Sequence, residues 1–537
     1  MDRKRLKIVC ITFGVLLGAL VGKLVYIQLI GHEDLSQAAA SQQLIALQGA
    51  NTRGLIYDCN GTPLVGNSME YIFIIREKQL DGEAQNALNI LGAEEIKNGD
   101  NGYRVFASSR YDKKTGERLI RNASAYIIEA GRRYSRQQPA VHMLGYVNPR
   151  DFSGAAGIEK MCDKELSLLN KKIFTTADVK GNLIPGRGLV VSTAMEADSY
   201  VKKGVATTLD AGLQKKVEEA LAKSGKNAAA VVIKSKSGEI AAAASTPVFD
   251  PNKISSYMDS RRQELINKVT QGEYPPGSVF KIAVAAAALE QGMQPEQTFV
   301  CKGYEEINGK RINCKTGGKN GHGTITLKEA FSQSCNSAFI QAGRQTGADA
   351  VLNMAYKLGL GQRVLEDYPD EKEGNLMTAY QSGGAAIANL SIGQGELLTT
   401  PLQVAKMTNI IAAQGKNPQI HLLLQEEARE AGQQIIRRET AEKIMEMMRQ
   451  TMITGSGKSL TADVEMAGKT GSAESRMAGH DAVHGWMTGF VPANDPEYTI
   501  TVFVEDVESG SSSAGPVFAE IAQYLSDSGS FEQALGF

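Results

Sequence analysis

The stretch YPPGSVFKIAVAAAALEQG, residues 274–292, constrains the fold of this chain more than any other part of its sequence. Residues 282–289 are all apolar, so a helix built from them is apolar on every side. Such a helix is stable in water only when other elements surround it. We therefore predict a helix that begins near Ser278, ends by Gly292 and is buried inside a large domain.

Ser278 and Lys281 lie one helical turn apart at the start of this predicted helix. A lysine held between apolar walls loses the solvation of its charged form, which lowers its pKa. A neutral amine within hydrogen-bond reach of a hydroxyl is a general base and makes the serine a nucleophile without histidine. The pattern Ser-x-x-Lys recurs by chance about once or twice in a chain of this length. The Pro-Pro-Gly turn before it and the apolar run behind it strengthen the prediction.

A second polar pair follows in FSQSCNSAF, residues 331–339. Ser334 and Asn336 are separated by one residue, so both side chains face one way if the backbone is extended. Serine and asparagine are also good helix N-caps. Taken alone, the pair favours a cluster of helix-capping residues.

The triplet Lys-Thr-Gly occurs three times, at residues 114–116, 315–317 and 469–471. The first two stand among charged or glycine-rich residues and indicate turns. Only the third follows an apolar stretch and precedes small residues, as an edge strand beside a cleft would. We therefore select Lys469, Thr470 and Gly471, because a glycine there lets a substrate backbone approach closely.

Charge and motif spacing exclude several other functions. The formal net charge is −1 over 537 residues, which provides no basic surface for nucleic acid. TGSGKS, residues 454–459, fails as a phosphate-binding loop because Met452 stands where a glycine is required. Neither Cys-x-x-Cys nor His-Glu-x-x-His occurs, so we predict no metal site and no cofactor. Cys301 and Cys314 either form a bridge worth about 3 kcal/mol or remain free thiols.

The N-terminus carries a basic stretch, residues 1–7, followed by an apolar one, residues 8–30. A bilayer core requires about 20 residues of helix. A cleaved signal peptide is the alternative, but the small residues at 37–41 lie too far behind the apolar run. We predict an uncleaved single-pass anchor in the cell membrane, with the N-terminus in the cytoplasm and the rest outside it.

The remaining chain divides by texture into two parts. Residues 31–200 alternate short apolar runs with turns and indicate an extended α+β domain. Residues 201–537 place a strand pair early, helices in the middle and strands late. We predict an α/β (α+β) sandwich with a mainly antiparallel sheet flanked by helices, in which the first and last strands meet.

Ser-x-x-Lys, Ser-x-Asn and Lys-Thr-Gly, in this order, resemble the signature of penicillin-recognising serine acyltransferases. With its flanking residues the chain resembles class B penicillin-binding proteins, which are monofunctional peptidoglycan D,D-transpeptidases. The resemblance extends over nearly the whole chain, and residues 31–200 are similar to the pedestal domain of that family. Cys59 and Ser135 depart from it, standing where arginine and proline are usual. Further matching stretches are residues 53–61, 132–145, 154–159, 237–252, 391–403, 467–474 and 484–492.

The resemblance implies a role for each residue of the first two motifs. Ser278 would attack the carbonyl of a D-Ala-D-Ala stem peptide and expel the last D-alanine. Lys281 would take the serine proton, and Ser334 would relay a proton to the leaving amine. Asn336 would hold the substrate amide and steady Lys281.

It also implies how substrate is held. Lys469 and Thr470 would bind the terminal carboxylate, next to Gly471, and the backbone N–H groups of Ser278 and Ser472 would form the oxyanion hole. β-Lactams would acylate the same serine. The implied partners are a membrane glycosyltransferase and other wall-synthesis proteins, and no nucleic acid.

Two alternatives stay open at this point. One is a non-catalytic penicillin-binding scaffold, and the other is a D,D-carboxypeptidase or β-lactamase, which passes the acyl group to water. Whether the chain serves division, elongation or sporulation is also open.

Overall fold

The computed structural model forms two compact units, each described here by itself. Unit 1 consists of Met1–Gly54, Ser68–Arg132 and Ser167–Lys203, and unit 2 of Leu55–Asn67, Arg133–Leu166 and Gly204–Phe537. The structure describes residues 3–25, 44–66, 68–98, 103–148, 152–167, 171–176, 189–193, 204–318, 320–376, 384–424, 432–477 and 480–531.

The first helix of unit 1, α1, spans Arg3–Val25. Residues 26–30 of the predicted membrane anchor lie outside the described residues. Within the residues that are described, we find no helix with both the length and the apolar character needed to cross a membrane.

The rest of unit 1 is built on two antiparallel sheets. One has the strand order β4-β5-β3-β6, and its phenylalanines Phe73 and Phe106 pack with Leu88 and Leu119 of two helices. The other has the order β1-β7-β8. The strands are β1 (Leu44–Thr52), β3 (Ser68–Arg76), β4 (Glu94–Asn98), β5 (Tyr103–Ser108), β6 (Tyr126–Arg132), β7 (Lys171–Thr176) and β8 (Leu189–Thr193), and the helices are η2 (Glu77–Gln79), α3 (Gly82–Ile90) and α4 (Lys113–Ala123).

The first Lys-Thr-Gly triplet, residues 114–116, lies in the first turn of α4. The prediction of a turn there is wrong. The Asp112 side chain accepts a hydrogen bond from the Thr115 N–H and caps a helix, as aspartate does at helix starts.

Unit 2 contains a five-stranded sheet in the order β11-β10-β20-β19-β18, in which every pair is antiparallel. The first strands meet the last ones, since Ala228 of β10 is paired with Val504 of β20. This confirms the predicted antiparallel sheet flanked by helices. The strands are β10 (Ala228–Lys234), β11 (Ile240–Thr246), β18 (Ala467–Met477), β19 (His480–Val491) and β20 (Tyr498–Val504).

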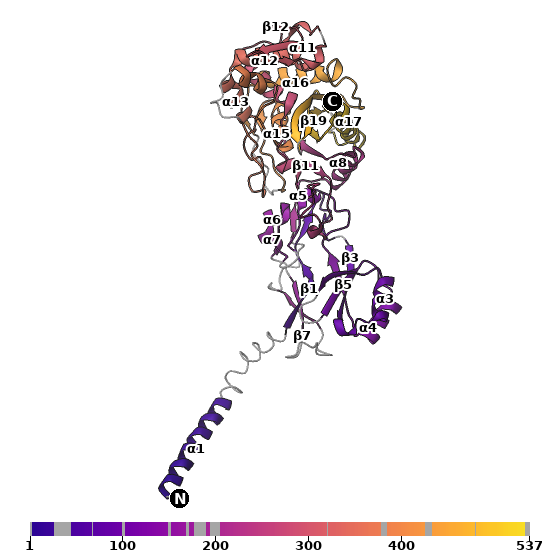
Figure 1. The fold of residues 1–537 in the computed structure, drawn as a ribbon, viewed down its shortest axis with the longest axis vertical. Helices are drawn as coiled ribbons and strands as arrows, with labels where there is room; N and C mark the ends of the chain where they lie inside the picture. Colours follow the sequence, from indigo (N-terminus) through magenta and orange to yellow (C-terminus); the bar gives the residue numbers. More distant parts are fainter. Residues whose placement is uncertain are drawn as a thin grey trace, which may run out of the picture. The chain divides into compact units, whose positions relative to one another are not determined.

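Helices cover both faces of this sheet because its apolar side chains alternate between them. Val502 packs with Val217 of α8 and Phe518 of α17 on one face. Its neighbour Phe503 packs on the other face, in the same core as Phe280. α8 (Ala211–Lys223) and α17 (Gly510–Asp527) thus form one layer, and α15 (Pro401–Ala412) and α16 (Arg438–Ile453) contribute to the other (Figure 1).

The apolar run predicted to be a buried helix is α10 (Lys281–Glu290), preceded by the single 3₁₀ turn η4 (Gly277–Phe280). Every residue of α10 up to Leu289 is buried, and helices α12, α13 and α16 pack around it. The surrounding helices are α11 (Leu327–Ser332), α12 (Asn336–Thr346), α13 (Ala348–Lys357) and α14 (Gly384–Ser391).

Two stretches from the first 200 residues, Leu55–Asn67 and Arg133–Leu166, pack with the later residues and belong to unit 2. Ile56 and Met143 are buried in one core with Val231 of the large sheet, and the buried Glu159 accepts hydrogen bonds from Arg133 and Tyr134. The predicted division at residue 200 remains a prediction.

The other elements of unit 2 are β2 (Leu55–Tyr57), β9 (Gly204–Ala206), β12 (Thr298–Cys301), β13 (Tyr304–Ile307), β14 (Lys310–Asn313), β15 (Gly323–Thr326), β16 (Lys416–Asn417), β17 (Gln433–Gln434), α5 (Val141–Leu144), α6 (Gly157–Met161), α7 (Asp163–Ser167, whose last residue belongs to unit 1), α9 (Lys268–Gln271), η3 (Ile254–Ser256) and η5 (Lys315–Gly317).

Candidate active site

Ser278 lies half-buried in η4, directly before the buried helix. Its turn is held against two other segments. The Gly277 N–H donates to the Gly393 carbonyl oxygen at 2.8 Å, and the Trp486 indole N–H donates to the Pro275 carbonyl oxygen at 2.9 Å. The hydroxyl is therefore presented by a turn that is fixed on both sides.

Gly277 has a φ of +55°, and a Cβ on it would lie 2.9 Å from the Ser472 carbonyl oxygen. Only glycine tolerates both this conformation and this approach. Strand β18 likewise approaches the turn at Gly471, where a Cβ would lie 3.1 Å from Val279 Cγ1. The third Lys-Thr-Gly triplet thus lies beside Ser278, on the edge strand that the sequence predicted.

Lys281 is buried, and its Nζ donates to three oxygens. These are the Ser334 carbonyl oxygen at 2.8 Å, the Asn336 Oδ1 at 2.8 Å and the Ser334 Oγ at 3.3 Å. Burial lowers the pKa of Lys281 to about 8, although Cys335 and Cys314 act in the opposite direction. A substantial fraction of the amine is therefore neutral at slightly alkaline pH.

Ser334 has a left-handed backbone, with φ at +56°. It is not extended, so the first of the two conformations considered for this motif is wrong. The helix-cap alternative holds in a modified form: Cys335 is the N-cap of α12 and accepts from the Ala338 N–H, while Asn336 is the first helical residue. The left-handed turn directs the Ser334 hydroxyl at Lys281 and Lys469.

Lys469 projects from β18 to the same serine, and its Nζ donates to Ser334 Oγ at 2.9 Å. The side chain is fully buried. Burial, and then the charge of Lys281, hold the pKa of Lys469 well below its usual range. The structure thus joins the three sequence motifs through one hydroxyl between two amines.

Thr470 and Ser472 point to other partners. Thr470 Oγ1 lies 2.6 Å from the Ser456 hydroxyl, and the Ser472 hydroxyl accepts from the Gly510 N–H at 3.1 Å. Sequence reasoning rejected residues 454–459 as a phosphate loop and missed Ser456 as a neighbour of the third motif. Gly393 was missed too, although its stretch was recognised as typical of the family.

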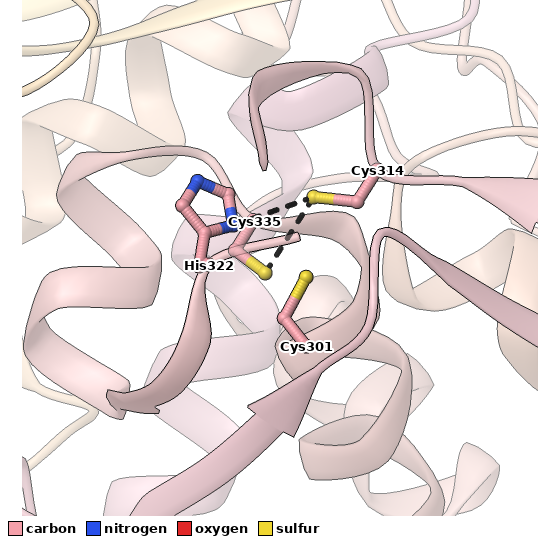
Figure 2. Close-up of side chains that lie close together, drawn as sticks. All are labelled: Cys301, Cys314, His322 and Cys335. Carbon is pink, nitrogen blue, oxygen red and sulfur yellow. Dashed lines mark hydrogen bonds between the residues drawn. The ribbon is translucent and has the colours of Figure 1, made fainter. Parts of the chain in front are cut away.

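A second cluster of side chains adjoins this site, because one of its members, Cys335, lies between Ser334 and Asn336. Cys301, Cys314, His322 and Cys335 place their ligand atoms within 4.8 Å of one another (Figure 2). The sequence predicted no metal site because no short metal-binding spacing occurs, and the fold nevertheless brings these four side chains together. Cys301 and Cys314 are free thiols, which agrees with the second of the two alternatives for this pair.

The sheet, the all-apolar helix and a serine beside two buried lysines define a penicillin-recognising serine acyltransferase. The model of the protein family described as "Penicillin binding protein transpeptidase domain" matches residues 228–523, which is more than half of the chain. The chain therefore belongs to this family. This confirms the class that the three sequence motifs indicated.

Relatives match over most of their length. Stage V sporulation protein D of Bacillus subtilis is 26% identical, with 97% of this chain and 85% of that protein covered. The peptidoglycan D,D-transpeptidase MrdA of Salmonella typhimurium is 26% identical over 97% of this chain and 96% of that protein. The fold matches a penicillin-binding protein, PBP2, of Helicobacter pylori with a TM-score of 0.72 at 22% identity, covering 91% of this chain and 100% of that one.

Proposed function

We propose that this chain is a membrane-anchored serine D,D-transpeptidase that cross-links peptidoglycan stem peptides through an acyl-enzyme on Ser278. The observation that carries the proposal is the position of the Ser334 hydroxyl, within hydrogen-bond reach of both Lys281 and Lys469. It supplies a proton path from the base at the nucleophile's helix to the substrate side of β18. The relatives named as D,D-transpeptidases support the same reaction.

In the acylation step the neutral Lys281 amine takes the proton of Ser278 Oγ, which attacks the carbonyl carbon of the penultimate D-alanine. The C–N bond to the last D-alanine breaks, and its nitrogen receives a proton relayed by Ser334. Asn336 holds Lys281 through its Oδ1. Its Nδ2 donates one hydrogen to the Asn313 carbonyl oxygen at 3.3 Å, and the second hydrogen is left for the substrate carbonyl next to the scissile bond. An amine from a second stem peptide then attacks the acyl-enzyme and releases Ser278.

The proposal assigns the oxyanion to the backbone N–H groups of Ser278 and Ser472. The close approach of the Gly277 turn to β18 supports this, because the two N–H groups belong to segments in direct contact. Preorganised donors of this kind stabilise the transition state more than the ground state. Lys469 and Thr470 hold the terminal carboxylate, whose negative charge favours the ammonium form of a lysine that burial otherwise disfavours.

We further propose that residues 8–30 anchor the chain in the cell membrane, with the N-terminus in the cytoplasm and the catalytic unit outside. The basic stretch before the apolar run supports this orientation. The proposed partners are a membrane glycosyltransferase and other wall-synthesis proteins. A solved structure similar in fold is a complex between PBP2 and MreC of Helicobacter pylori, with a TM-score of 0.70, and it supports the proposal that this chain also binds a protein partner.

Labelling of the full-length protein in detergent with a fluorescent penicillin tests the proposal. We expect one adduct, located by mass spectrometry on the peptide that contains Ser278, and none in Ser278→Ala. The matched control is Ser237→Ala, an exposed serine in the β10–β11 turn, which should label like the wild type. An unlabelled wild type would identify a non-catalytic scaffold.

A second assay separates transpeptidation from hydrolysis. A stem pentapeptide is supplied with and without a D-amino acid as acceptor amine. We expect an exchanged product in proportion to the acceptor. Release of D-alanine alone, unaffected by the acceptor, would identify a carboxypeptidase, and rapid turnover of penicillin would identify a β-lactamase.

A further inference from the structure

The cluster of Cys301, Cys314, His322 and Cys335 is drawn from four separate segments of unit 2. Cys301 ends β12, Cys314 follows β14, His322 precedes β15, and Cys335 caps α12. Figure 2 shows their side chains pointing toward one centre. Neither the Ser278 chemistry nor any other step of the proposed reaction uses them.

The backbone is shaped to bring these segments together. β12 and β15 are antiparallel, with Cys301 paired to Gly323, so His322 is delivered next to Cys301. Gly321, with φ at +72°, lies so close that a Cβ on it would be 2.2 Å from the Cys301 carbonyl oxygen. A residue with a side chain would separate the two segments. The cluster is therefore a built feature of the fold.

All four ligand atoms lie within 4.8 Å of one another, and the distances from Cys314 Sγ to two of them match a tetrahedral metal ion. Zn–S bonds of about 2.3 Å and Zn–N bonds of about 2.0 Å place two tetrahedral sulfurs about 3.8 Å apart and a sulfur and a nitrogen about 3.5 Å apart. The Cys314 and Cys335 sulfurs are 3.6 Å apart, and Cys314 Sγ is 3.7 Å from His322 Nδ1. A disulfide would need a separation of about 2.05 Å.

The cluster also has the burial and the donor types of a structural site. Cys301, Cys314 and Cys335 are no more than 2% exposed. Three thiolates and one imidazole select Zn²⁺ over the harder cations, and four protein ligands leave no open position for catalysis. We propose that unit 2 binds one structural Zn²⁺ through Cys301, Cys314, His322 and Cys335. Binding releases the thiol protons to solvent, and the thiolates hold the metal.

The metal would act on the active site through position. Cys335 lies between Ser334 and Asn336, the two residues whose oxygens hold the Lys281 amine. Tying the Cys335 sulfur to β12, the β14 end and His322 fixes the left-handed turn of Ser334. Cys335 is thus a positioning residue, which touches the metal and not the substrate.

Metal analysis of the full-length protein tests this proposal. We expect about one zinc ion per chain after purification without added metal. After chelation and reloading with cobalt, we expect the absorption band that thiolate ligands produce with Co²⁺. Cys301→Ser and His322→Gln should each lose metal during dialysis against a weak chelator. The matched control, Cys59→Ser, changes a cysteine outside the cluster and should keep the full metal content.

The outcomes are decisive in each direction. A wild type that neither carries zinc nor gains the cobalt band when Co²⁺ is added would overturn the proposal, as would a disulfide between Cys314 and Cys335 found by mass spectrometry of alkylated protein. His322 is partly exposed, so we expect the His322→Gln variant to fold even if Cys301→Ser unfolds. Metal content does not depend on penicillin labelling, so failure here leaves the proposed transpeptidase untouched.

Discussion

The rate of acylation by a β-lactam should rise steeply with pH, because the proposed base is the neutral form of Lys281. Burial lowers the pKa of this amine to about 8. The neutral fraction is then about 1% at pH 6 and about 90% at pH 9. The second-order rate of acylation should therefore increase on the order of a hundredfold over this range and level off above pH 8. If the base were a lysine with the ordinary pKa of about 10.4, the rate of acylation would still be rising at pH 9.

The assay is the rate at which a fluorescent penicillin labels the full-length protein, measured at constant ionic strength from pH 6 to pH 9. The control is Ser278→Ala, which reports any labelling that does not pass through the nucleophile. The penicillin concentration is kept well below saturation, so the profile reports groups of the free enzyme. A flat profile, or one that falls as the pH rises, would refute the assignment of Lys281 as the base.

Two further predictions concern stability and the nucleophile's turn. Burial lowers the pKa of His142 to about 4, so its contribution to stability is complete above about pH 6.5 and is lost as the pH falls toward 4. The free energy of unfolding should fall by about 3 kcal/mol over this range through His142 alone. Denaturant titrations should therefore find a smaller fall between pH 6.5 and pH 4 in His142→Gln than in the wild type. An equal fall in the two proteins would contradict this prediction. Gly393→Ala should slow acylation on the order of a hundredfold, because its Cβ would lie 2.0 Å from the Gly277 carbonyl oxygen. The matched control is Gly225→Ala, which has a similar φ but open space around its Cβ; comparable rates in the two variants would argue against displacement of the turn.

The elements that the sequence predicted well are those with a strong local signal. The apolar run of α10 leaves burial as the only stable outcome, and the strands around Val231 and Val502 alternate between two cores as β-strands do. The edge strand at Lys469 was separable from the other two Lys-Thr-Gly triplets by its flanking residues. At residues 114–116 the same approach failed, since a single capping aspartate outside the triplet decided in favour of a helix.

The features that were missed depend on contacts between distant segments. The ligands at residues 301, 314, 322 and 335 match no short metal-binding spacing, and only the pairing of β12 with β15 and the cap of α12 bring them together. The left-handed φ of Ser334 has no sequence signal of its own, because serine is not a residue that favours it. Gly393 is required by the backbone of Gly277, more than a hundred residues earlier in the chain.

The strand order of the large sheet also sets the sequence in which this unit can be completed. β10 is made early, yet one of its two neighbours, β20, is among the last elements of the chain. Until that strand arrives, β10 keeps an open edge, and contacts between such distant segments form slowly. The segment with Ser278 rests on β18 and β19, which also arrive late. During synthesis, therefore, the serine cannot become reactive before nearly the whole chain has been made, and a truncated product would be inert toward penicillin.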